Sequence, residues 1–138
     1  WFEVTAKYER MLDDGSTKKV SEIYVAEAHS FSEVEKRIMN EVGKAVRGGV
    51  EVNKIAPAGY KEVVFSDNSG DDHWFKAKVS FITLDEKTGK EKRATTQYLV
   101  QAECFDDAVE HINSFMQSSG DYLTATVSET KIIDVFEK

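Results

Sequence analysis

Of the side chains in this sequence, those of the two tryptophans are best suited to stacking on a nucleic-acid base. Trp1 and Trp74 each open a segment of alternating apolar and polar residues, with Lys7 after the first and Lys76 and Lys78 after the second. Aromatic rings stack on exposed bases while lysines contact the phosphates, so this arrangement suits single-stranded nucleic acid. The competing interpretation is that each Trp packs at the edge of a sheet. The net charge of -7 favours packing, because an acidic chain repels a polyanion.

Two basic pairs occupy matching places in the sequence. Lys18-Lys19 and Lys92-Arg93 each follow the tip of an expected hairpin. Two such pairs could clamp a polyanion. Charged side chains also protect exposed strands from aggregation, and we favour this second interpretation.

The residues that could bind a metal or act as nucleophiles lack the spacing for either role. Asp71-Asp72-His73 offers three ligands, but consecutive residues rarely converge on one ion, so a solvated linker is favoured. His29 precedes an expected helix and His111 is expected on the solvent side of another. Cys104 begins a helix, where a thiol pKa can fall, yet no histidine stands at a nucleophile-base spacing. The sequence therefore predicts no metal, no cofactor and no catalytic residue.

A repeated pattern of elements positions these residues. Residues 1–8 align with 74–81, Gly15 with Gly89, and residues 24–38 with 98–112. Each copy alternates like a half-buried strand, turns at its glycine and returns as a second strand. The expected strands cover residues 2–8, 20–28, 50–55 and 60–65, then 75–81, 94–102, 122–128 and 131–136.

A helix is expected after each hairpin. Ser30 and Glu33 form a capping box at the start of the first helix. Glycines at 48–49 and 120 are expected to end the two helices. Apolar residues then recur at helical spacing and predict the faces that pack on the sheets. These stripes are Phe31, Val34, Ile38 and Val42, and then Phe105, Ala108, Val109, Ile112 and Met116.

The order of elements predicts an α+β fold made by tandem duplication of a β-β-α-β-β unit. We expect antiparallel sheets, one helix per repeat and pseudo-twofold symmetry. The predicted repeats are residues 1–65 and 74–138, with a linker at 66–73. A unit of about 65 to 70 residues is marginal alone, so the copies are expected to form one compact body.

Composition excludes several classes of protein. Hydrophobic residues make up 41% and charged residues 31%, which is neither a disordered nor a membrane composition. No apolar run approaches the roughly 20 residues of a membrane span, and no signal peptide is visible. The single cysteine fits a reducing compartment, so a cytoplasmic location is expected.

Three stretches resemble the family known as domain of unknown function number 4494. They are Trp1-Phe2-Glu3, residues 22–33, and residues 79–89 together with 127–131. The resemblance covers nearly the whole chain and implies an origin in gut anaerobes or their phages and mobile elements. It supplies no catalytic residues.

The sequence thus predicts an acidic, non-enzymatic binding module of unknown function. The expected partner is another protein or a second copy of the chain. The alternative is a single-stranded nucleic-acid-binding protein that uses the two Trp residues and the basic pairs. No interaction with a membrane is expected.

Overall fold

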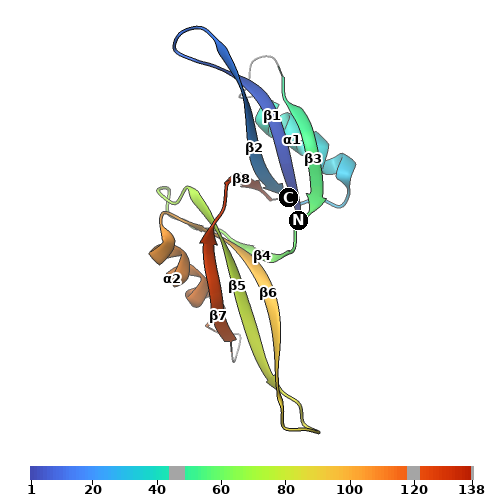
Figure 1. Cartoon of the computed structure of the whole chain (residues 1–138), viewed down its shortest axis with the longest axis vertical. Coiled ribbons are helices and arrows are strands. Elements are labelled where there is room, and N and C mark those ends of the chain that lie inside the picture. Colours follow the sequence, from blue (N-terminus) through green and yellow to red (C-terminus); the bar gives the residue numbers. More distant parts are fainter. Residues whose placement is uncertain (44–48, 118–121, 138) are drawn as a thin grey trace. The chain divides into compact units, whose positions relative to one another are not determined.

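The computed structural model describes residues 1–43, 49–117 and 122–137. In this part of the chain, eight strands form two four-stranded sheets and two helices accompany them (Figure 1). The strands are β1 (Phe2–Met11), β2 (Thr17–Ala26), β3 (Glu51–Pro57), β4 (Tyr60–Val64), β5 (His73–Leu84), β6 (Glu91–Ala102), β7 (Tyr122–Glu129) and β8 (Ile132–Phe136). The helices are α1 (Phe31–Gly43) and α2 (Phe105–Met116). The predicted α+β class is confirmed.

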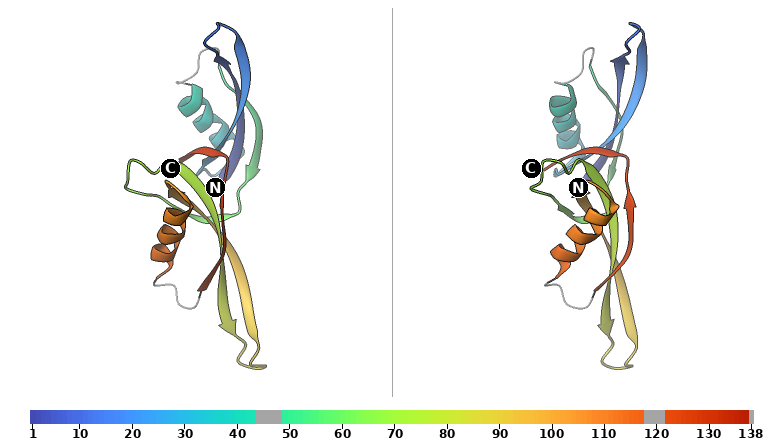
Figure 2. Two further views of the ribbon diagram at one scale, coloured as in Figure 1. Left: turned by 60° about the vertical axis from the view of Figure 1, so that its left-hand side comes forward. Right: turned by 90° about the vertical axis from the view of Figure 1, so that its left-hand side faces the viewer.

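The chain divides into two compact units. Unit 1 comprises Trp1–Ala58 and Lys131–Lys138, and unit 2 comprises Gly59–Thr130. The sheet of unit 1 has the order β3-β1-β2-β8, and that of unit 2 has the order β4-β6-β5-β7. In each unit the helix lies on one face of the sheet (Figure 2).

The core of unit 1 lies between its sheet and α1. Because side chains alternate along a strand, Val4 and Ala6 of β1 face the helix, and both are fully buried. Val34 and Ile38 of α1 pack against them at helical spacing. The hairpin turns at Gly15, whose φ of +85° is one that glycine adopts without strain.

Unit 2 is built in the same way. Ala77 and Val79 of β5 are fully buried against Ile112 and Met116 of α2. Its hairpin turns at Gly89, with a φ of +67°. The faces predicted for the first strand of each copy are therefore confirmed.

The edge strand beside each return strand differs from the sequence prediction. β8 runs parallel to β2, and β4 runs parallel to β6. The prediction of wholly antiparallel sheets is therefore wrong. The units also differ from the predicted segments 1–65 and 74–138, because β4 belongs to unit 2 and β8 to unit 1. Alternation shows which face of a strand is buried but not which strand it pairs with.

The two sheets share the positions of their register irregularities. The pairing of β1 with β3 shifts between Thr5 and Ala6, and that of β5 with β7 shifts between Lys78 and Val79. These are aligned residues in the sequence repeat. The two parallel pairings also change register at aligned places. The pairing of β2 with β8 shifts directly before Tyr24, and that of β6 with β4 shifts directly before Tyr98. Aligned residues therefore occupy the same place in each sheet.

Each hairpin extends past the rest of its sheet. In unit 1, β3 pairs with β1 only as far as Lys7, and β8 reaches only Ile23 of β2. Residues 8–11 and 17–20 consequently form a two-stranded arm, and residues 21–22 at its base have no partner on the β8 side among the described strands. In unit 2, β7 reaches Phe81 and β4 reaches Gln97, so a similar arm continues beyond them.

The predicted capping box is present. Ser30 Oγ accepts a hydrogen bond from Glu33 N at 3.2 Å, and Glu33 Oε2 accepts one from His29 N at 3.0 Å. The described part of α1 runs to Gly43, and the predicted helix ends at Gly48 and Gly120 lie outside the described residues. Neither described helix has the length and apolarity that crossing a membrane requires.

The predicted burial of Phe31 and Phe105 is wrong, because each is 52% exposed. The buried stripes begin one turn later, at Val34 and Ala108. Helical side chains lean toward the N-terminus, so a side chain at the first position projects past the helix end. Phe31 packs edge-on against Phe2 instead, with 5.2 Å between ring centroids.

Candidate functional site

A groove of about 850 Å³ lies in unit 1, between the hairpin arm, the last turn of α1 and strand β8. Two of its residues, Met11 and Ile133, are apolar side chains that are more than half exposed. The groove is lined by Tyr8, Glu9, Arg10, Met11, Thr17, Tyr24, Glu41, Val42, Ile133, Asp134 and Phe136. It therefore combines apolar contact surface with charged groups.

A hydrogen-bonded cluster centred on Glu22 holds the groove's tyrosines. Tyr8 donates its hydroxyl hydrogen to Glu22 Oε1 at 2.8 Å, and Tyr24 donates to Oε2 at 2.6 Å. Arg10 Nη2 lies 3.3 Å from Glu22 Oε1 and 3.1 Å from the Tyr8 hydroxyl. Burial, followed by the hydrogen bond to Glu22, raises the pKa of Tyr24 above its ordinary value. Tyr24 therefore keeps its hydrogen and its donor role at neutral pH.

The fold does not require this cluster. Glu22 lies opposite Ala6 in the ladder, and Thr96 lies opposite Val79 at the aligned place in unit 2. Phe81 aligns in the same way with Tyr8. The same sheet forms in unit 2 with a neutral hydroxyl and an apolar ring at these places, so the strand pairing does not depend on the cluster.

The two tryptophans do not form an open stacking platform. Trp74 is only 3% exposed and packs edge-on against Phe65, with ring centroids 5.7 Å apart. Trp1 is half-buried, and its carbonyl accepts a hydrogen bond from Ala58 N at 2.9 Å. A base cannot stack on a ring as buried as Trp74, so the packing interpretation holds for that residue.

The predicted basic residues lie on the surface of their own units. Lys7 and Lys78 are exposed and Lys76 is half-buried, while Lys18 and Lys19 are exposed on the arm of unit 1. In unit 2, Lys92 Nζ lies 3.7 Å from Asp85 Oδ2, and Arg93 Nη2 lies 3.9 Å from Glu91 Oε2. Neighbouring carboxylates thus offset the charge of the second pair.

The family of the chain follows from a match over its whole length. The family model described as "Domain of unknown function (DUF4494)" matches residues 1–138. The chain belongs to this family. The resemblance seen in the three sequence stretches is thereby confirmed. No curated protein and no solved structure matches the chain.

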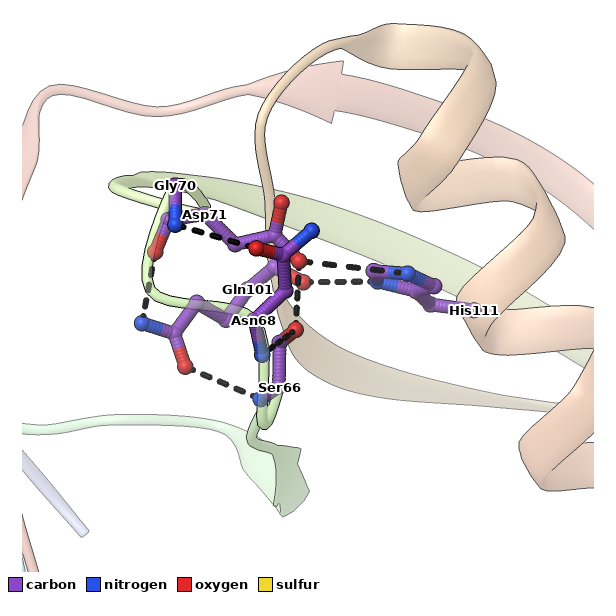
Figure 3. A network of polar contacts seen from close by, with 6 residues as sticks. All are labelled: Ser66, Asn68, Gly70, Asp71, Gln101 and His111. Atoms are coloured by element: carbon purple, nitrogen blue, oxygen red, sulfur yellow. Dashed lines mark hydrogen bonds and ion pairs between the residues drawn. The ribbon is translucent and has the colours of Figure 1, made fainter.

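Within the segment 66–72 of this DUF4494 member, most residues are exposed, but Asp71 is not solvated as predicted. Asp71 is only 4% exposed, and its Oδ2 accepts a hydrogen bond from the Ser66 hydroxyl (Figure 3). Gln101 fastens the loop to β6, donating to the Asp71 carbonyl at 2.8 Å and accepting from Ser66 N at 2.9 Å. His73 instead turns its ring toward Asp72 and Glu129. Asp71, Asp72 and His73 therefore do not converge on one point.

His111 also differs from its predicted place on the solvent side of α2. Its side chain is only 33% exposed, and Nδ1 lies 2.9 Å from the carbonyl oxygen of Gln101 (Figure 3). A pattern in the sequence indicates this placement. Glu103, Asp107 and His111 are spaced four residues apart, which places them along one side of a helix and its N-terminal extension.

Cys104 of the DUF4494 chain occupies the N-cap position of α2 with an extended backbone, and its side chain makes no capping hydrogen bond. Serine is a preferred residue at this position because its oxygen accepts from a free backbone N–H. We therefore expect Cys104→Ser to raise the free energy of unfolding by about 0.5 to 1 kcal/mol. Urea denaturation of the two proteins measures the difference, with Ser30→Ala as the opposite control. A neutral or destabilising effect of Cys104→Ser would contradict the prediction.

Proposed function

We propose that this chain is a non-enzymatic binding module that holds an extended, basic segment of a partner protein in the groove of unit 1. We further propose that it arose by tandem duplication of a β-β-α-β-β unit. The shared register irregularities and the matching turn glycines support the duplication. In this view one copy acquired the Glu22 cluster while the other kept the apolar and neutral residues at the same places.

The observation that carries the proposal is the uncovered edge of β2 beside the groove. Among the described strands, β8 pairs with β2 only from Ile23 to Ala26, and residues 17–22 continue beyond it along the arm. An extended peptide can add a strand to such an edge, with backbone hydrogen bonds supplying affinity. Thr17 lines the groove directly, so side chains of an added strand would reach it.

The charge of the groove favours a basic partner. Glu9, Glu41 and Asp134 line it together with the cation Arg10. Arg10 is bonded to Glu22 and Glu41 is paired with Arg37, so Glu9 and Asp134 supply the negative charge for a partner. Complementary charge gives specificity and faster association. Exposed Met11 and Ile133 suit apolar residues on either side of a lysine or arginine.

Selection from a library of displayed 12-residue peptides tests this function. We expect the enriched peptides to carry a lysine or arginine between apolar residues, and to bind in calorimetry with moderate salt dependence. Asp134→Asn should weaken a selected peptide by about 1 kcal/mol, or roughly fivefold in Kd. Glu62→Gln is the matched control, because Glu62 stands opposite Tyr98 as Asp134 stands opposite Tyr24.

Two results would contradict the proposal. One is equal weakening by Asp134→Asn and Glu62→Gln, which would mean that overall charge and not the groove controls binding. The other is tighter binding of single-stranded oligothymidine than of any selected peptide, which would favour the nucleic-acid alternative.

A further inference from the structure

Three carboxylates that are distant in the sequence meet in unit 2. Asp71 comes from the loop before β5, Glu103 follows β6, and Asp107 lies in the first turn of α2. One carboxylate oxygen from each lies within 4.8 Å of the other two. Ligands around one divalent cation, at about 2.0 to 2.6 Å from the ion, are separated by distances of this size.

The innermost of these carboxylates is incompletely satisfied. The Asp71 side chain is 2% exposed, and Oδ2 is engaged by the Ser66 hydroxyl. Oδ1 is buried and has no hydrogen-bond partner among the described residues. Buried carboxylate oxygens are usually hydrogen-bonded or bound to a cation, because burial removes the water that would otherwise solvate them. The beginning of α2 lies beside it, yet no backbone N–H satisfies this oxygen.

His111 presents a lone pair to the same carboxylate. Its Nδ1 lies 2.9 Å from the Gln101 carbonyl oxygen, which can only accept, so Nδ1 carries the hydrogen (Figure 3). In the neutral ring Nε2 is then the unprotonated nitrogen, and it lies 4.0 Å from Asp71 Oδ2. Two acceptor atoms face each other with a gap that suits an ion. A ring held by a backbone carbonyl through its other nitrogen is the usual support of a metal-binding histidine.

We propose that Asp71, Glu103 and Asp107 form a site for one divalent cation, and that His111, whose Nε2 lies 4.0 Å from Asp71 Oδ2, turns toward the ion as a fourth ligand. Three carboxylates make the site hard and anionic, while the imidazole adds a ligand that favours transition metals over Ca²⁺ and Mg²⁺. Mn²⁺ accepts both kinds of ligand. The bound ion would tie the loop before β5 to the start of α2. This inference departs from the expectation that the chain binds no metal.

The described residues of unit 1 do not repeat this arrangement. His29, Glu33 and Arg37 stand at the places that align with Glu103, Asp107 and His111. Glu33 is used there in the capping box, and Arg37 Nε lies 3.2 Å from Glu41 Oε1. The proposed site is thus a property of unit 2, as the Glu22 cluster is of unit 1.

Titration with Mn²⁺, followed by the electron paramagnetic resonance signal of the free ion, tests the proposal. We expect the full chain to remove one equivalent of Mn²⁺, and its melting temperature to rise with added Mn²⁺ because the ion binds the folded state. Glu103→Gln and Asp107→Asn should each weaken binding by about tenfold or more. Both side chains are partly or fully exposed, so these variants should fold.

Asp106→Asn is the matched control, because it removes an exposed carboxylate from the same helix turn but outside the cluster. Nitrogen hyperfine coupling to bound Mn²⁺ should be visible in the wild type and lost in His111→Gln. Failure to take up one equivalent would overturn the proposal. Equal weakening by Asp106→Asn and Asp107→Asn would also overturn it, because binding would then follow surface charge alone.

Discussion

Replacing Ile38 or Ile112 by Ala is expected to lower the free energy of unfolding by about 2 to 5 kcal/mol. Both side chains are fully buried at aligned places, each between its helix and its sheet. Truncation removes apolar contact and leaves a cavity that the surrounding residues fill only in part. Urea denaturation followed by circular dichroism measures the loss.

Phe31→Ala and Phe105→Ala are the controls for this experiment. Each ring is 52% exposed, so its truncation should cost clearly less than that of the nearby isoleucine. A larger loss at the phenylalanines than at the isoleucines would show that the helix faces are assigned incorrectly.

Introducing a charge into β8 is expected to destabilise unit 1, even though the strand that precedes β8 in the sequence, β7, belongs to unit 2. Val135 is 7% exposed and pairs with Val25 of β2. Val135→Asp would place a carboxylate at a buried position, which should cost about 2 to 5 kcal/mol. Hydrogen exchange should show lost protection at residues 23–26 of β2, while the β5–β6 hairpin keeps its protection.

Val63→Asp in β4 is the reciprocal variant. Val63 pairs with Leu99 of β6, so protection should be lost in unit 2 and kept in the β1–β2 hairpin. Loss of protection in the hairpin that directly precedes the altered strand, in either variant, would contradict the observed pairing. The two variants together therefore test the strand arrangement and not stability alone.

The proposed peptide site and the proposed cation site lie in different units and can be tested separately. Variants at Asp134 should leave Mn²⁺ uptake unchanged, and variants at Asp107 should leave peptide binding unchanged. The register places each pair of aligned positions at the same point of its sheet, so differences between the units mark residues that the fold does not need.

The sequence alone determined the local elements of this protein. The alternation in residues 2–8 and 75–81 predicted the first strands and their buried faces, and Gly15 and Gly89 marked the turns. The Ser30 capping box located the start of α1. Each of these features depends on interactions between residues close in the chain, so the pattern of residue types is sufficient to predict it.

Only the tertiary structure decided which distant segments meet. The residue pattern of β4 and β8 fits the edge of any sheet that has one buried face. It therefore could not show which unit each strand joins or that each runs parallel to its neighbour. The burial of Asp71 and its approach to Glu103 and Asp107 likewise depend on which distant segments meet. Loop residues 66–72 look polar and solvated in sequence, and their environment is set by α2 and β6, which lie about 30 or more residues further along the chain.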